Sequence, residues 1–113
     1  MVQKCYSGDL ELDRIKENFT ESIQTKIAAA EALSDDIQTA AQMLTICLLN
    51  GNKILACGNG PAAALSQLFV SQLVHRFETA RPSLPALALS ADSCLLSGVA
   101  AEDGFVDVYA KQI

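Results

Sequence analysis

The amino-acid sequence predicts an α/β fold built on a parallel sheet, and three observations lead to this prediction. A short apolar run at 53–57 is bounded by Gly51 and Gly58, as expected of a buried strand. A second apolar run lies at 85–89, and between the two runs Pro61 suits the first position of a helix. Strand, helix and strand in this order form a βαβ unit, whose strands are parallel with a right-handed crossover.

The N-terminal region predicts two amphipathic helices. Apolar side chains recur at steps of three and four residues in the first of them, at Leu12, Ile15, Phe19, Ile23, Ile27, Ala30 and Leu33. The run Ser-Asp-Asp at 34–36 is expected to break this helix, and Asp35 with Gln38 has the spacing of a capping box for the next one. The second helix is expected to end at Asn50-Gly51, a typical C-terminal cap.

Beyond the first strand, Pro61 suits the first position of a helix that we expect to extend to about Glu78. A loop at 81–83 leads to the second strand, a short helix begins near Ser93, and 105–113 is expected to form a last helix. Two strands are few for a parallel sheet. The chain is therefore either part of a larger α/β domain, which we favour, or a protein that hides apolar surface in an oligomer.

Composition excludes several classes of function. The chain has 113 residues, of which half are apolar and 19% charged, so it is globular and long enough for one domain. A net charge of −5 without a cluster of Lys and Arg disfavours direct binding of nucleic acid. No run approaches the roughly 20 apolar residues of a membrane span, and the N-terminus does not resemble a secretory signal. We therefore expect no membrane contact and a cytoplasmic location.

The four cysteines, Cys5, Cys47, Cys57 and Cys94, form no CxxC pair, and the chain has a single histidine. A zinc site made of these residues is not expected. We expect reduced thiols, with Cys47 and Cys57 packed as small hydrophobic side chains.

Candidate binding residues follow each predicted strand, at the edge where open α/β sheets bind ligands. Gly58-Asn59-Gly60 precedes the helix at Pro61, and a glycine turn at a helix N-terminus can hold a phosphate group. The same residues are equally suited to a tight turn that binds nothing. Ser90 and Asp92 follow the second strand, and we favour Asp92 as the cap of the helix near Ser93.

Longer runs resemble a known family, the sugar-isomerase (SIS) domain. These runs are residues 50–60, NGNKILACGNG, and 74–78, VHRFE. Segments 19–25, 27–33, 76–79, 81–85 and 108–112 resemble the branch that contains phosphoheptose isomerases and DnaA initiator-associating (DiaA) proteins, on its DiaA side. The resemblance implies a partial SIS domain over 1–113, with a helical region at 1–51 and the first βαβ half at 52–113. Family members continue with more strands, a phosphate loop rich in Ser and Thr, and a further helix.

The resemblance also implies roles for the residues at the strand ends. It implies sugar-phosphate contact for Gly58, Asn59 and Gly60, and a place near the sugar for Asp92. Phosphoheptose isomerases have a serine where this chain has Ala62, whose methyl group cannot donate a hydrogen bond to phosphate. Ser66 lies one turn further along the same face of the helix. It could replace the missing hydroxyl only if it came within hydrogen-bond distance of the phosphate.

At the positions of the isomerases' metal ligands, this chain differs more from the isomerases than it does at Ala62. The resemblance places His and Glu where this chain has Leu68 and Gln72, four residues apart on one helix face. Leucine has no donor atom, and a glutamine amide is a weak ligand compared with imidazole or carboxylate. We therefore expect no metal on this helix, and we expect His75 to be a solvated surface residue.

Together these residues imply a non-catalytic adaptor that resembles DiaA. Such an adaptor binds a DnaA-type initiator, promotes its assembly at the origin, reaches DNA only through that partner and forms a homo-oligomer, a tetramer at full length. No cofactor is implied. The alternative is a sedoheptulose 7-phosphate isomerase, which would require zinc, and a third possibility is a sensor that binds sugar phosphate without turnover. We also expect exposed apolar surface and self-association of this chain.

Overall fold

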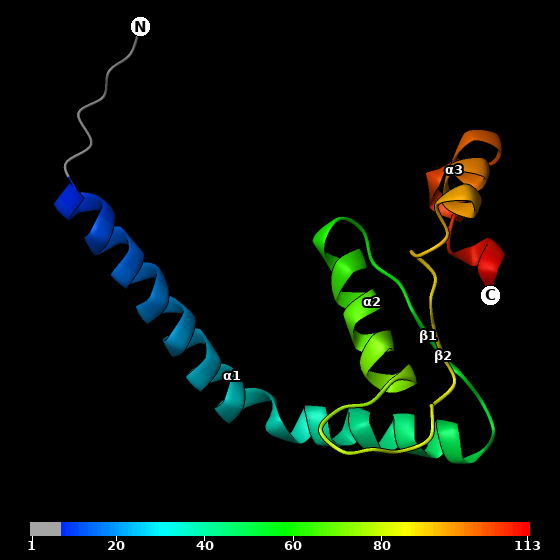
Figure 1. Cartoon of the computed structure of the whole chain (residues 1–113), viewed down its shortest axis with the longest axis horizontal. Coiled ribbons are helices and arrows are strands. Elements are labelled where there is room, and N and C mark those ends of the chain that lie inside the picture. Colours follow the sequence, from blue (N-terminus) through cyan, green and yellow to red (C-terminus); the bar gives the residue numbers. More distant parts are fainter. Residues whose placement is uncertain (1–7) are drawn as a thin grey trace, which may run out of the picture. The chain divides into compact units, whose positions relative to one another are not determined.

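The computed structural model describes residues 8–113 (Figure 1). The chain forms two compact units, Met1–Gln42 and Met43–Ile113, which are described separately below. The elements in chain order are α1 (Gly8–Leu49), β1 (Ile54–Ala56), α2 (Pro61–Val74), β2 (Ala86–Ala88), α3 (Ser93–Glu102) and two 3₁₀ turns, η1 (Phe105–Asp107) and η2 (Ala110–Gln112). Within the described residues, no helix is both long enough and apolar enough to cross a membrane.

The N-terminal region is one continuous helix, so the prediction of two helices with a break at 34–36 is wrong. The hydroxyl groups near the predicted break hydrogen-bond inside the helix instead of capping a new one. Ser34 Oγ donates to the carbonyl oxygen of Ala30 at 2.5 Å, and Thr39 Oγ1 donates to that of Asp35 at 3.0 Å. Such bonds to the preceding turn are compatible with a helix that continues through the polar residues.

The predicted apolar stripe of the first unit is present, and it faces solvent. Phe19 is 68% exposed, and Ile23 and Ile27 are 55% and 56% exposed. Over residues 10–42 the stripe lies on a helix whose other residues are also exposed, except half-buried Ala29. An apolar stripe of this size is normally covered by another protein surface.

The second unit contains the predicted βαβ arrangement. β1 and β2 pair in parallel, with Ile54 opposite Ala86, Leu55 opposite Leu87 and Ala56 opposite Ala88. In Figure 1 the two strands run in the same direction, and α2, which contacts both, lies beside them and runs in the opposite direction. The α/β class and the parallel pairing of the two strands are therefore confirmed. Both strands are three residues long, so each is shorter than its apolar run.

The buried hydrophobic side chains of this unit come from β1, from the residue after β2, from α3 and from the segment between η1 and η2. Among the described residues, the buried hydrophobic side chains are Ile54, Leu89, Val99 and Val108. The residues that alternate with the buried ones point the other way, because successive strand side chains face opposite sides of a sheet. Leu55 and Leu87, which are register partners, are 36% and 56% exposed.

The helix α2 ends at Val74, four residues before the predicted end at Glu78. The guanidinium group of Arg81 explains this end, because it donates to the carbonyl oxygens of Gln72 at 2.6 Å and Leu73 at 2.8 Å. Both carbonyls belong to the last turn of the helix, where backbone carbonyls lack a partner within the helix. The carbonyl of Leu73 also accepts from the N–H of Leu84 at 3.1 Å. Glu78 itself has a φ of +59°, which is incompatible with a continuing right-handed helix.

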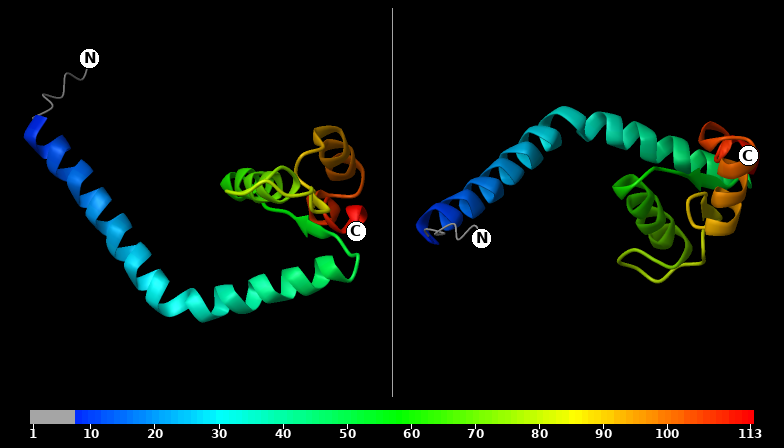
Figure 2. Two further views of the ribbon diagram at one scale, coloured as in Figure 1. Left: turned by 60° about the horizontal axis from the view of Figure 1, so that its bottom comes forward. Right: turned by 90° about the horizontal axis from the view of Figure 1, so that it is seen from above.

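The last predicted helix, 105–113, is also wrong, because this segment forms the two short turns η1 and η2. Gly104 precedes them with a φ of +105° and redirects the chain after α3. Val108, between the turns, is only 1% exposed. Both views in Figure 2 show these turns beside α3, consistent with the contacts between α3 and η1.

Candidate functional site

The turn after β1 requires glycine for steric reasons. A Cβ atom added at Gly58 would lie 2.6 Å from the carbonyl carbon and oxygen of Ala62 and 2.8 Å from its Cβ. Gly60 has a φ of +55° and immediately precedes α2. The turn between β1 and α2 therefore needs both glycines for packing and backbone conformation, whether or not a ligand binds.

The first turn of α2 uses some of the backbone donors that a phosphate would need. Pro61 has no N–H group, the N–H of Ala62 donates to Asn59 O at 3.1 Å, and that of Ala63 donates to Gly60 O at 3.0 Å. The side chain of Ala62 is exposed but offers only a methyl group. An anion at this end of α2 would depend chiefly on the amide of Asn59 and on the partial positive charge of the helix.

Two serines meet at the end of the second strand. Ser66 on α2 is 7% exposed, and its Oγ donates to Ala63 O at 2.8 Å. Ser90, which follows β2, places its Oγ 3.1 Å from that of Ser66. The two predicted candidates are thus brought together, and the pair links α2 to the end of β2. Since the Ser66 hydroxyl is buried and already bonded, it contributes to packing at this position.

Asp92 caps α3, as the sequence predicts. Its Oδ1 accepts a hydrogen bond from the N–H of Leu95 at 2.9 Å, and its backbone is extended, as is usual for an N-cap residue. This carboxylate oxygen satisfies one of the first unpaired N–H groups of the helix.

Sequence reasoning missed the residues that close the site at the strand ends. The Tyr109 hydroxyl lies 2.6 Å from Gly58 O and 2.8 Å from Asn59 Oδ1. Gln112 Nε2 donates to Leu89 O at 3.0 Å and to the carbonyl of the residue four positions earlier at 2.7 Å. One short segment therefore contacts the carboxyl ends of both strands. The signal for it was present in the sequence, since 108–112 is one of the runs that carries the family resemblance.

The two positions that correspond to metal ligands hold no metal-binding pair. Leu68 is 56% exposed, and the backbone carbonyl of Gln72 is engaged by Arg81. Within residues 8–113, no group of three or more His, Cys, Asp and Glu side chains is placed to hold a metal ion. His75 lies at the end of α2 and is exposed, as expected.

The cysteines only partly match the expectation. Cys47 is half-buried, whereas Cys57 and Cys94 are exposed, so the prediction that Cys57 packs as a small hydrophobic residue is wrong. Cys57 comes directly after β1 and two residues after exposed Leu55, so it continues the exposed side of the strand. These three thiols are free, and Cys5 lies outside the described residues.

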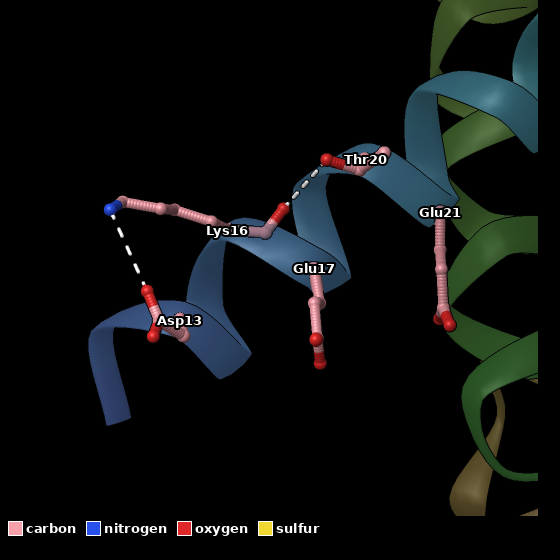
Figure 3. A pocket seen from close by; sticks show the side chains of 5 residues that line it. All are labelled: Asp13, Lys16, Glu17, Thr20 and Glu21. Carbon is pink, nitrogen blue, oxygen red and sulfur yellow. Dashed lines mark hydrogen bonds and ion pairs between the residues drawn. The ribbon is translucent and has the colours of Figure 1, made fainter. Parts of the chain in front are cut away.

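A shallow depression on α1 is not a candidate site. Figure 3 shows that its lining side chains, Asp13, Lys16, Glu17, Thr20 and Glu21, all come from one helix. Lys16 Nζ lies 3.7 Å from Asp13 Oδ1, and both side chains are about two-thirds exposed. Such a solvated pair contributes about 0–1 kcal/mol to the free energy of unfolding. Because the lining comes from a single helix, a ligand would be contacted from one side only.

The relatives of this chain agree on its family. The model of the SIS domain matches residues 18–113. The DnaA initiator-associating protein DiaA of Yersinia enterocolitica is 60% identical over 102 residues, which cover 90% of this chain and 52% of the relative. DiaA of Photorhabdus laumondii is 57% identical over the same shares. The chain thus spans about half the length of the curated relatives it matches.

Solved structures are similar over the same part of the chain. A phosphoheptose isomerase from Francisella tularensis matches with a TM-score of 0.86 and 44% identity, over 90% of this chain and 53% of its own. The phosphoheptose isomerase GmhA from Neisseria gonorrhoeae matches with a TM-score of 0.82 and 36% identity, over 89% and 52%. The parallel β1–α2–β2 unit, the glycine turn and the family match over 18–113 lead to one conclusion: the chain belongs to the SIS-domain family.

Proposed function

We propose that this chain belongs to a non-catalytic adaptor of the DiaA type, which binds a DnaA-type initiator and promotes its assembly at the origin. The identity of 57–60% to DiaA proteins over 90% of the chain is the observation that carries this proposal. The similarity to the isomerase structures is lower, at 36–44% identity. Leucine and glutamine at positions 68 and 72 also favour an adaptor, because they cannot anchor a catalytic metal.

Direct contact with DNA is not part of the proposed role. The net charge of −5 opposes the phosphate contacts that dominate such binding, and it suits contact with a basic, DNA-binding partner. We place this activity in the cytoplasm, where initiator and origin are found together.

A binding assay with the initiator tests the proposal. The chain is immobilised and titrated with DnaA, with DiaA of Yersinia enterocolitica as the positive reference and the Francisella tularensis isomerase as a control for the shared fold. Saturable binding by this chain and by DiaA, but not by the isomerase, is the expected result. Binding that is absent from this chain but present in DiaA would contradict the proposal for residues 1–113.

Self-association is the second part of the proposal, with a tetramer as the full-length form. The exposed stripe at Phe19, Ile23 and Ile27 supports it, since fully burying each such side chain contributes about 1.5–3 kcal/mol. Sedimentation velocity is expected to show an oligomer that Ile23→Glu dissociates. Thr25→Glu adds the same charge about 200° around the helix, and it should leave the oligomer intact. A monomeric wild type at high concentration would refute this part.

A sugar-phosphate isomerase, or a protein that binds sugar phosphate without turnover, is the alternative. The glycine turn at the strand end and the likeness to phosphoheptose isomerases favour it. Incubation with sedoheptulose 7-phosphate and added zinc separates the two roles. Turnover well above background would refute the adaptor proposal, whereas saturable binding without turnover would favour a sensor. We propose no cofactor for the adaptor.

A further inference from the structure

The segment that contains the turns η1 and η2 reaches back to the edge of the sheet at which both strands end. Tyr109 contacts the turn after β1, and Gln112 contacts the end of β2 through Leu89 O. A third side chain, Lys111, lies 2.5 Å from Asp103 Oδ2 at the end of α3. Buried Val108 anchors the segment between these polar contacts. The segment is thus fixed at three separate places, so the position of Tyr109 is well defined.

The phenol of Tyr109 has one proton, which it shares between two acceptors, Gly58 O and Asn59 Oδ1, in a three-centre hydrogen bond. The two acceptors belong to adjacent residues of the turn, so the phenol oxygen lies between them. The Asn59 side chain thereby has its Oδ1 directed at Tyr109. Its other amide atom, Nδ2, is consequently directed away from Tyr109, because the two atoms lie on opposite sides of the planar amide.

Asn59 is exposed and lies where a ligand of an open α/β sheet would approach. With Oδ1 engaged by the phenol, the side chain offers two N–H donors and withholds its acceptor. Two such donors suit an oxygen atom that accepts hydrogen bonds, such as a phosphate or hydroxyl oxygen. With the amide reversed, the same side chain would instead favour a donor. The contact with Tyr109 therefore determines whether Asn59 offers hydrogen-bond donors or an acceptor to a ligand.

We infer that Tyr109 is a positioning residue, which holds the Asn59 amide so that its N–H groups face a ligand that carries acceptor oxygens. For its ligand, the inference rests on the alternative function given above, the binding of sugar phosphate. For its geometry, it rests on the contact between Tyr109 and Asn59. Its role differs from that of Gln112, which ties down the same segment without contacting Asn59.

The test uses the full chain labelled with ¹⁵N, in which the side-chain NH₂ signals of Asn59 report on its amide. Sedoheptulose 7-phosphate is the probe, added to wild type and to Tyr109→Phe, which keeps the ring and removes the hydroxyl. The Asn59 signals are expected to shift in this variant, and the probe should bind about five-fold more weakly, as for the loss of one neutral hydrogen bond.

Two matched variants separate positioning from tethering. Gln112→Leu removes another of the tethers of the segment and should leave the Asn59 signals in place, with probe binding within two-fold of wild type. Tyr6→Phe, at the other tyrosine of the chain, makes the same chemical change and should alter neither measurement. If Gln112→Leu reproduces the effects of Tyr109→Phe, Tyr109 is only a tether and the inference is overturned.

The two measurements, probe binding and the Asn59 signals, test different statements. If wild type does not bind the probe, the alternative function of sugar-phosphate binding is lost, and the Asn59 signals alone decide the inference. A shift in Tyr109→Phe but not in Gln112→Leu then supports it, and unchanged Asn59 signals in Tyr109→Phe overturn it.

Discussion

Replacing Gly58 by alanine would place a methyl group 2.6 Å from the carbonyl carbon and oxygen of Ala62. Ordinary contacts of a Cβ atom begin near 3.4 Å, so the backbone of the turn or of α2 would have to move by about 0.8 Å (3.4 − 2.6). The two nearest atoms belong to the backbone, and the third, the Cβ atom of Ala62 at 2.8 Å, is bonded directly to it, so none of them can rotate aside. Overpacking of this kind costs about 1–3 kcal/mol, and we expect Gly58→Ala to lower the free energy of unfolding by that amount.

The chain contains a matched control for this substitution. Gly98 lies inside α3, and a Cβ atom added there would have no atom within 4 Å other than those of its chain neighbours and of the nearby helix backbone. Because alanine is the better helix former by about 0.8–1.0 kcal/mol, Gly98→Ala should raise the free energy of unfolding. The two identical changes are thus expected to have opposite signs.

Urea unfolding followed by circular dichroism, at one fixed protein concentration, measures both variants against wild type. Gly58→Ala should move the midpoint to lower urea and Gly98→Ala to higher urea. If Gly58→Ala is as stable as wild type, the close approach of the turn to the first turn of α2 is refuted. The turn would then need glycine for no steric reason, and a ligand would become the better explanation for Gly58.

Three further predictions test other parts of the second unit. Arg81→Ala should lower the free energy of unfolding by about 1–2 kcal/mol, which is below the full value of a charged hydrogen bond because Arg81 is partly exposed. The control Arg76→Ala should have little effect, and equal effects of the two variants would contradict the cap at the end of α2. Asp92→Ala should cost about 1 kcal/mol in urea unfolding and Asp92→Asn much less, because asparagine also caps; similar losses would exclude the N-cap role. The double variant Leu68→His with Gln72→Glu should bind zinc measurably by calorimetry, whereas each single variant should not; zinc binding by wild type at this helix would refute our account of these positions.

The sequence predicted the parts of the fold that depend on local pattern. The strands around Ile54 and Leu87 were predicted from short apolar runs, and their parallel pairing followed from the intervening helix. Asp92 was predicted as a cap because its residue type and position are locally sufficient. The prediction of a SIS domain came from the resemblance of longer runs to the family. The glycine turn alone is too common a pattern to indicate that domain.

The predictions that were wrong depend on interactions that cannot be inferred from a local sequence pattern. Ser34 was interpreted as a helix breaker, but its hydroxyl bonds to the preceding turn. The end of α2 depends on Arg81, which is seven residues beyond Val74. The last segment forms turns instead of a helix because Gly104 redirects it and because its polar side chains bond to the strand ends. Tyr109 was missed as a site residue for the same reason, since its partners lie about 50 residues earlier.

The contact between Tyr109 and Gly58 also has a consequence for the order of folding, because it joins residues 51 positions apart. β1, α2 and β2 are near neighbours in sequence and can associate before the last segment docks. The turn around Asn59 would receive its final side-chain arrangement only afterwards, once the chain beyond Gly104 has settled onto the strand ends. The residues best placed to recognise a ligand are thus the last to become ordered. Their hydrogen exchange would follow fraying of the final segment instead of global unfolding.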